Sequence, residues 1–246
     1  MVIDNNPDIP AGGDKVYTII VAAGSGLRFG SAVPKQFLPL AGVPVLVRTV
    51  RAISDALPAG RILLVLSPDG EKYWHDISAG LELPDVTIVH GGASRSESVA
   101  NAITYIESRG DATADTIVMV HDGARPLVHP DMVRTLHAAF GNPDILAAVP
   151  VLPLTEAIAT VSGEDVVPTP RDGFRTVQTP QAFRGNIIAE AYRAAEGAVY
   201  ADDAAVVAAY TGKSLHSVRG HVQNIKITNA TDIAIAEVLL AHPLPY

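Results

Sequence analysis

The sequence predicts an α/β fold in which a mostly parallel sheet is flanked by helices. Apolar residues make up 48% of the 246 residues while aromatic residues make up only 5%, so Val, Ile, Leu and Ala must build most of the core. This composition is typical of buried parallel strands. Short apolar segments also alternate with segments of helical periodicity, as expected for parallel strands joined by right-handed helical crossovers.

Each element is predicted from its apolar spacing and its flanking residues. The predicted strands cover residues 16–23, 61–67, 86–90, 116–121 and 145–151. The predicted helices cover residues 44–57, 94–108, 130–140, 186–197, 203–211 and 231–241. The helix at 94–108 has a defined start, because Ser94 followed by Glu97 is a capping-box pattern. A further strand pair is predicted over residues 214–228.

The alternation stops between residues 152 and 175, a segment with three prolines and two β-prone pieces. Ser162-Gly163-Glu164-Asp165 is a turn signal between those pieces. We therefore predict a protruding β-hairpin, here called the hairpin arm (residues 152–175). Since an isolated hairpin buries little of its own surface, we expect the arm to pack against a second copy in a homodimer. The remainder of residues 15–246 is predicted to be a single domain, and residues 1–14 a disordered leader.

Charge and cysteine content exclude several classes of protein. A net charge of −8 argues against a nucleic-acid partner, which would require clustered Lys and Arg. The absence of cysteine excludes disulfides, thiolate catalysis and Cys-ligated metals, and it fits a cytoplasmic protein. No apolar run approaches the length that spans a bilayer, so no membrane association is expected. The first residues also lack the basic and apolar parts of a signal peptide.

A glycine-rich loop, AAGSGLRFG (residues 22–30), follows the first strand. Glycines in this position let backbone N–H groups approach an anion closely. The loop lacks the Gly-Lys-Ser/Thr of a P-loop, and Phe29 stands where a dinucleotide fingerprint requires its third glycine. Arg28 and Lys35 add positive charge, which favours a triphosphate. The alternative is a plain tight turn with two solvated charges.

A second loop, GGASRSES (residues 91–98), joins a predicted strand to a helix N-terminus. Unpaired N–H groups at such a terminus can hold a phosphate or a base edge. Helix capping alone would explain Ser94 and Glu97. It would not explain the glycine pair or Arg95, so we interpret this loop as a ligand contact.

A third loop, HDGARP (residues 121–126), lies at the carboxyl end of a predicted strand, where open α/β sheets bind ligands. Asp122 suits Mg²⁺, which takes one or two carboxylates and completes its shell with phosphate oxygens and water. An ion pair between Asp122 and Arg125 that stiffens the loop is the alternative. We interpret His121 as structural, as is usual for a lone histidine at a strand end.

The fourth segment is NIKIT (residues 224–228), in which Lys226 stands between two isoleucines. An ammonium group between buried neighbours on a strand needs a partner, and an anionic substrate would supply one. The alternative is a lysine on an edge strand that points to water.

The chain contains, in order, the motifs AAGSGLRFG, PKQF, GGASRSESV, HDGARP, QTPQAF, the acidic pair Asp202-Asp203 and NIKIT. Together these motifs resemble the 2-C-methyl-D-erythritol 4-phosphate cytidylyltransferase family of the non-mevalonate isoprenoid pathway. The resemblance runs from about residue 17 to residue 240. Many sugar nucleotidyltransferases share the first loop, whereas HDGARP, TPQ and NIKIT are more specific. The resemblance implies a Rossmann-like fold of the nucleotidyltransferase type and transfer of a cytidylyl group from CTP to a polyol phosphate, releasing pyrophosphate.

The resemblance also implies a role for individual residues. The triphosphate and the transition state would be held by the catalytic residues Arg28, Lys35 and Lys226. The nucleotide would contact Ala22, Ala23, Gly24, Ser25, Gly26, Gly91, Gly92 and Ser98. The methylerythritol phosphate would contact Arg125, Arg171 and Thr179, with the hairpin arm reaching across a dimer. Thr155 is a further candidate for this contact, from a shifted register of the arm. Asp122 would help to position Mg²⁺.

Two departures from the family pattern keep alternatives open. The arm reads Thr155-Glu156-Ala157 where the family has an Asp-Thr-Ile-Lys-like stretch, and Ala93 replaces an Asp that often follows the two glycines. Ribitol 5-phosphate is therefore an alternative acceptor, which would make the protein a ribitol 5-phosphate cytidylyltransferase. An alternative of another class is a regulatory module that binds nucleotide without catalysis, although the joint presence of Arg28, Lys35, Asp122 and Lys226 argues against it.

Overall fold

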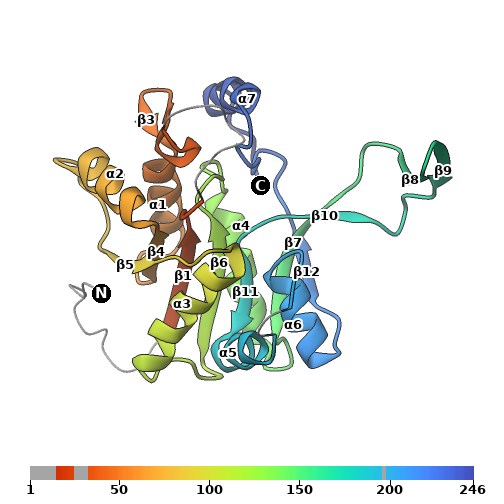
Figure 1. Ribbon diagram of the computed structural model, residues 1–246, viewed down its shortest axis with the longest axis horizontal. Coiled ribbons are helices and arrows are strands. Elements are labelled where there is room, and N and C mark those ends of the chain that lie inside the picture. Colours follow the sequence, from red (N-terminus) through yellow and green to blue (C-terminus); the bar gives the residue numbers. More distant parts are fainter. Residues whose placement is uncertain (1–14, 25–32, 196–197) are drawn as a thin grey trace.

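The computed structural model describes residues 15–24, 33–195 and 198–246. An eight-stranded mixed sheet with helices on both faces forms the body of the molecule (Figure 1). The strand order is β10-β7-β11-β6-β1-β4-β5, and β12 pairs with β7. The strands are β1 (Lys15–Val21), β4 (Arg61–Leu66), β5 (Val86–His90), β6 (Thr116–Asp122), β7 (Ala147–Pro153), β10 (Arg175–Val177), β11 (Gln181–Arg184) and β12 (His216–Arg219). The predicted α/β class with a mostly parallel sheet is confirmed.

The helices are α1 (Val45–Ala56), α2 (Pro68–Ser78), α3 (Arg95–Ser108), α4 (Pro130–Ala138), α5 (Gly185–Ala194), α6 (Asp203–Thr211) and α7 (Ala230–Ala241). Short 3-10 turns cover Lys35–Phe37 and Ala139–Gly141, and the two-residue strands β2 (Pro39–Leu40) and β3 (Val43–Pro44) pair with each other. In the described part of the chain, no helix combines the length and apolar character needed to cross a bilayer.

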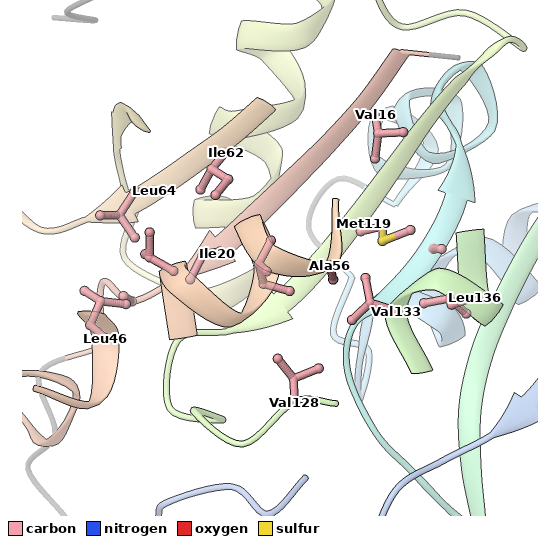
Figure 2. Close-up of a cluster of buried hydrophobic side chains, with 14 of the residues drawn as sticks. Val16, Ile20, Leu46, Ala56, Ile62, Leu64, Met119, Val128, Val133 and Leu136 are labelled. Atoms are coloured by element: carbon pink, nitrogen blue, oxygen red, sulfur yellow. The ribbon is translucent and has the colours of Figure 1, made fainter. Parts of the chain in front are cut away.

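Alternating side chains of the sheet build two separate cores. Along β1, Val16 and Ile20 pack on the face that α1 and α4 cover, together with Leu46 and Leu136 (Figure 2). The residues between them, such as Ile19, face α3, α5 and α6. Since successive side chains of a strand point to opposite faces, both faces of the central strands are buried.

The register of the central strands sets the position of the site. In the parallel pairing of β1 with β6, Val21 lies opposite Asp122, and in the pairing of β1 with β4 it lies opposite Val65. The carboxyl ends of these strands are therefore level. The glycine-rich loop leaves the sheet directly beside the 121–126 loop.

The sequence prediction differs from the structure at residues 214–228, at helix α2, and at strands β10 and β11, which it does not contain. The predicted strand pair over residues 214–228 is wrong, because only His216–Arg219 is a strand. Residues 224–228 form an irregular segment whose backbone bonds to the 121–126 loop instead of a sheet edge. The helix α2 is absent from the sequence prediction. It has a Ser67 cap and Pro68 in its first turn, and within it only Gly70 and Trp74 are buried.

Strands β8 (Ile158–Ser162) and β9 (Asp165–Thr169) form a separate antiparallel hairpin within residues 152–175. Figure 1 shows this hairpin far from the main sheet. Its turn contains Gly163 at φ +63°, a conformation that glycine adopts without strain. Several apolar side chains of the hairpin are solvent-exposed, among them Val161 at 69% and Val166 at 63%.

Candidate active site

Asp122 lies at the carboxyl end of β6 among three cationic side chains. Lys226 Nζ is 3.0 Å and Arg125 Nε 3.3 Å from its Oδ2 atom, while Arg95 Nε is 3.6 Å from Oδ1. Burial alone would raise the pKa of Asp122, but the charges of Lys226, Arg95 and Arg125 outweigh it and hold the pKa well below its usual range. The ion pair between Asp122 and Arg125, the alternative interpretation of this loop, is present, and Asp122 is ionised.

Lys226 reaches Asp122 because its neighbours anchor the 224–228 segment. Ile227 is fully buried against Leu40 and Val45, and its N–H donates to the Ala124 carbonyl at 2.8 Å. Arg125 Nη1 donates to the Asn224 carbonyl at 2.8 Å. The isoleucines thus fix the segment in the core and leave the Lys226 side chain partly exposed, at 41%. The interpretation of Lys226 as an edge-strand lysine pointing to water is wrong, because its ammonium group pairs with Asp122.

Thr179 links His121 to the backbone of Asp122 through hydrogen bonds. The Asp122 N–H donates to Thr179 Oγ1 at 3.1 Å, and Thr179 Oγ1 lies 3.0 Å from His121 Nδ1. Since Nε2 of His121 faces the Arg125 carbonyl at 3.2 Å, we assign the proton to Nε2 and let the Thr179 hydroxyl donate to Nδ1. Complete burial lowers the pKa of His121 to about 4. His121 is therefore a neutral structural residue, as predicted.

The second loop packs directly against the end of β1. A Cβ atom added to Gly91 would lie 2.5 Å from Ala23 Cβ and 2.8 Å from Ser98 Oγ, so no larger residue fits there without displacement. Ser98 Oγ accepts from the Gly92 N–H at 3.1 Å and donates to the Ser94 carbonyl at 2.8 Å. The structure thus brings together Ala23, Gly91, Gly92 and Ser98, four of the predicted nucleotide contacts.

Capping explains part of this loop. The N-cap Ser94 accepts from the Glu97 N–H at 3.0 Å, as predicted. The Glu97 carboxylate accepts from the Ala93 N–H at 2.8 Å, one residue before the N-cap. The Arg95 guanidinium binds Asp203, so contacts within the protein account for this arginine.

Gln36 is a site residue that the sequence prediction missed. Its Nε2 atom donates to the carbonyls of Ala22 and Gly24, at 2.8 and 2.9 Å, from a side chain that is 5% exposed. Gln36 therefore fixes the point where the glycine-rich loop leaves β1. The motif PKQF contains this residue, but a search for charged side chains passes over a buried amide.

Of the remaining predicted triphosphate contacts, the structure describes only Lys35. Lys35 precedes Gln36, in the 3-10 turn Lys35–Phe37. Burial acts to raise the pKa of Asp232, at the start of α7, but the pKa is lowered overall. Hydrogen bonds from Thr228 and Asn229 are the larger lowering causes, and the charge of Lys35 adds to them. Lys35 thus lies near the end of the 224–228 segment. The predicted contacts Ser25, Gly26 and Arg28 lie outside the described residues.

Two predicted acceptor contacts come from the hairpin arm. Arg171 Nη1 donates to the backbone carbonyl of Thr155, and both residues are exposed. The structure therefore brings Thr155 and Arg171 together at the base of the arm. The other two, Arg125 and Thr179, lie beside Asp122 and are already bound to groups of the protein. Within residues 15–24, 33–195 and 198–246, no group of three or more His, Asp or Glu side chains is arranged to hold a metal.

Sequence and structure comparisons assign the family. A family model described as 2-C-methyl-D-erythritol 4-phosphate cytidylyltransferase matches residues 16–242. The chain belongs to this family. It is 36% identical over 225 residues to the 2-C-methyl-D-erythritol 4-phosphate cytidylyltransferase of Phocaeicola vulgatus, covering 91% of this chain and 99% of that protein. It is 43% identical to the enzyme of the same name from Cereibacter sphaeroides, over 91% of this chain and 96% of the relative.

A solved structure agrees with this assignment. The crystal structure of the 2-C-methyl-D-erythritol 4-phosphate cytidylyltransferase from Thermus thermophilus superimposes with a TM-score of 0.70 at 33% identity, covering 92% of this chain and 99% of that chain. The chain is therefore a cytidylyltransferase, and the predicted resemblance is confirmed.

The buried neutral His121 predicts a pH-dependent stability. An unfolded histidine binds a proton below a pH of about 6.5, whereas the folded His121 does so only near 4, so falling pH favours the unfolded state. Between pH 7 and pH 5 the contribution of His121 to the free energy of unfolding should fall by about 2 kcal/mol. Denaturant unfolding at both pH values should show this additional loss in the wild type and not in His121→Asn.

The exposed His242 offers a matched control, because His242→Asn should keep the pH dependence of the wild type. An equal pH dependence in the wild type and in His121→Asn would contradict the assignment of His121 as a buried neutral residue.

Proposed function

We propose that this cytidylyltransferase transfers a cytidylyl group from CTP to 2-C-methyl-D-erythritol 4-phosphate, with Asp122 and Lys226 at the centre of the site. The observation that carries this assignment is the convergence of Lys226, Arg125 and Arg95 on one ionised carboxylate beside the phosphate-binding loop. Gly91, Gly92 and Ser98 would hold the cytosine and ribose. The glycine-rich loop, with Arg28 and Lys35, would hold the triphosphate.

The reaction needs no general base. The acceptor is a phosphate monoester, which carries about −1.5 to −2 charge at pH 7, so its oxygen is already ionised. That oxygen attacks the α-phosphorus of CTP in line, and the bond to the pyrophosphate oxygen breaks. The pyrophosphate then leaves with the bonding electron pair. The burial and neutrality of His121 are consistent with this scheme.

The difficulty of the reaction is to bring two polyanions together. Preorganised positive groups lower this barrier by stabilising the charge on the phosphoryl oxygens in the transition state. Lys226 is half-exposed and pairs with Asp122 at 3.0 Å, so it can exchange this carboxylate for the α-phosphate when CTP enters. Asp122 would thus hold Lys226 in the site before the nucleotide binds.

We further propose that a divalent cation, most simply Mg²⁺, takes part. The residues fit such an ion, because Asp122 is a hard oxygen ligand that stays ionised and Mg²⁺ commonly combines one or two carboxylates with substrate phosphates. Asp122 would hold the ion together with triphosphate oxygens. When bound, the ion would neutralise charge on the phosphates.

We also propose that the enzyme is cytoplasmic, because the absence of cysteine fits a reducing compartment.

Substitution of the cationic residues tests the proposed roles. Lys226→Ala, Lys35→Ala and Arg28→Ala should each reduce turnover by about 10² to 10³, the usual cost of removing one preorganised donor. Pyrophosphate release with CTP and the polyol phosphate measures turnover, and circular dichroism checks the fold. Lys72→Ala removes an exposed lysine of α2 and should change turnover little. Near-normal turnover in any of the first three variants would remove that residue from the site.

The acceptor is tested with a panel of substrates. Because the arm carries Glu156 and Ala157 where the family has an Asp-Thr-Ile-Lys-like stretch, ribitol 5-phosphate remains the alternative acceptor. With CTP and Mg²⁺, we expect pyrophosphate release with 2-C-methyl-D-erythritol 4-phosphate and little with ribitol 5-phosphate, and little competition by ATP, GTP or UTP. Preference for ribitol 5-phosphate would reverse the assignment. Tight CTP binding without pyrophosphate release from any acceptor would favour the non-catalytic regulatory module.

We also propose a homodimer in which the hairpin arm packs against a second copy. The exposed valines of β8 and β9 are an apolar surface that a partner would cover. The arm carries Thr155 and Arg171, so it would bring these acceptor contacts towards the neighbouring site.

Sedimentation tests this assembly. The wild type should be a dimer at micromolar concentration, and Val161→Asp together with Val166→Asp should shift it to monomer because each places a charge in the apolar surface. The control Val199→Asp changes a valine that is 98% exposed outside the arm and should leave the dimer intact. A monodisperse wild-type monomer would rule out the proposed dimer.

A further inference from the structure

A buried carboxylate lies next to the site and has no part in the proposed reaction. Asp203, the first residue of α6, is fully buried. Its Oδ1 atom accepts from Arg95 Nη1 at 2.9 Å and from the Tyr192 hydroxyl at 2.5 Å, and its Oδ2 atom accepts from Arg95 Nη2 at 2.7 Å. Both carboxylate oxygens are thus bound, and the main partner is Arg95 of the 91–98 loop, for which we propose nucleotide binding.

The geometry of this pair fixes the third nitrogen of the guanidinium. A guanidinium group is planar and rigid, so two hydrogen bonds from its Nη atoms to one carboxylate define its plane and direction. The Nε atom of Arg95 is then left 3.6 Å from Asp122 Oδ1. Asp203 therefore determines where the positive charge of Arg95 lies relative to Asp122.

The burial of Asp203 makes this arrangement persistent. A buried carboxylate without a partner is strongly unfavourable, so Asp203 binds Arg95 tightly through two hydrogen bonds. Arg95 is also the first residue of α3, shortly after Gly91 and Gly92. The Arg95 side chain thus connects the 91–98 loop, the end of β6 and the start of α6.

The environment of Asp122 is divided between its two oxygens. Lys226 and Arg125 lie on the side of Oδ2, while Arg95 lies on the side of Oδ1. Released from Asp203, Arg95 could form a close pair with Oδ1. That pair would compete with Lys226 and Arg125 for the orientation of the Asp122 carboxylate.

We propose that Asp203 is a positioning residue for cytidylyl transfer, which acts by holding Arg95 beside Asp122 and beside the nucleotide-binding loop. Its neighbour Asp202 has a different role. Asp202 caps α6 through the Ala205 N–H at 2.9 Å and accepts from Gln181 Nε2 at 2.9 Å. Of the acidic pair, one residue thus fastens α6 to β11 and the other orients an arginine of the site.

Asp203→Asn removes the negative charge and one of the two oxygen atoms that accept from Arg95, while it keeps the side-chain volume. We expect kcat to fall about 10- to 100-fold, the range observed when a group that orients a ligating side chain is lost. The KM for CTP should rise about tenfold through the shared loop, whereas the KM for the acceptor should stay within about twofold because Asp203 acts on the nucleotide side. A purely structural role of Asp203 would lower the unfolding temperature without this difference between the two KM values.

Arg95→Lys tests the same fork from the other partner. A lysine keeps the charge but cannot make two parallel hydrogen bonds, and Arg95 is one-third exposed, so the change should be tolerated by the fold. The variant should lose activity in the same range. The double variant Asp203→Asn/Arg95→Lys should be no worse than the worse single variant, because both changes break one pair.

Tyr210→Phe is a matched control on the same helix. Tyr210 donates to the Glu190 carboxylate at 2.8 Å on the exposed side of α6, so its loss removes a similar bond away from the site. Wild-type activity of Asp203→Asn or of Arg95→Lys would overturn the inference, and so would losses that multiply in the double variant or a KM for the acceptor that rises as much as that for CTP.

The inference rests on the proposed function of Asp122, and Asp122→Asn separates the two. An inactive Asp122→Asn combined with an active Asp203→Asn would overturn only the positioning role. An active Asp122→Asn would instead contradict the proposed site itself and, with it, the positioning role.

Discussion

The site depends on keeping one carboxylate charged at the end of a buried strand. Asp122 is mostly buried, and without compensation its burial would favour protonation. Lys226, Arg125 and Arg95 supply that compensation from three separate parts of the chain. Because a buried charge is stable only with partners, the requirement to pair Asp122 draws these segments together around the carboxyl ends of β1 and β6. The contacts that satisfy this folding constraint are thus the same contacts that form the proposed active site.

The sheet makes this convergence possible. β1 and β6 are adjacent and parallel, so the glycine-rich loop and the 121–126 loop emerge side by side although they are far apart in the sequence. Strands β10 and β11 pair antiparallel with β7 on either side of residues 178–180, and this interruption turns Thr179 towards the backbone of Asp122. Asn224 Nδ2 donates to the Thr179 carbonyl at 2.8 Å and to Gln178 Oε1 at 3.5 Å, which ties this interruption to the 224–228 segment. The site is therefore assembled by loops that a mixed sheet with parallel central strands holds in register.

The sequence is sufficient for the fold class and for the motifs around the site, because apolar runs and glycines are local signals. It is not sufficient for the partners of each charge. The sequence favours a ligand contact for Arg95, since nothing local indicates that Asp203, 108 residues later, binds it. Two flanking isoleucines predict a strand for Lys226, whereas these residues anchor an irregular segment in a small core next to α7. Pairing between distant residues depends on the topology, which spacing along the chain does not encode.

Gln36 has a consequence for the electrostatics of the glycine-rich loop. Its amide group occupies the carbonyl oxygens of Ala22 and Gly24, the negative ends of two peptide dipoles at the mouth of the loop. Carbonyl oxygens that face an incoming polyanion would repel it, and here they are directed towards a neutral donor. A side chain without formal charge thus withdraws two acceptors from the start of the loop where we propose that the triphosphate binds.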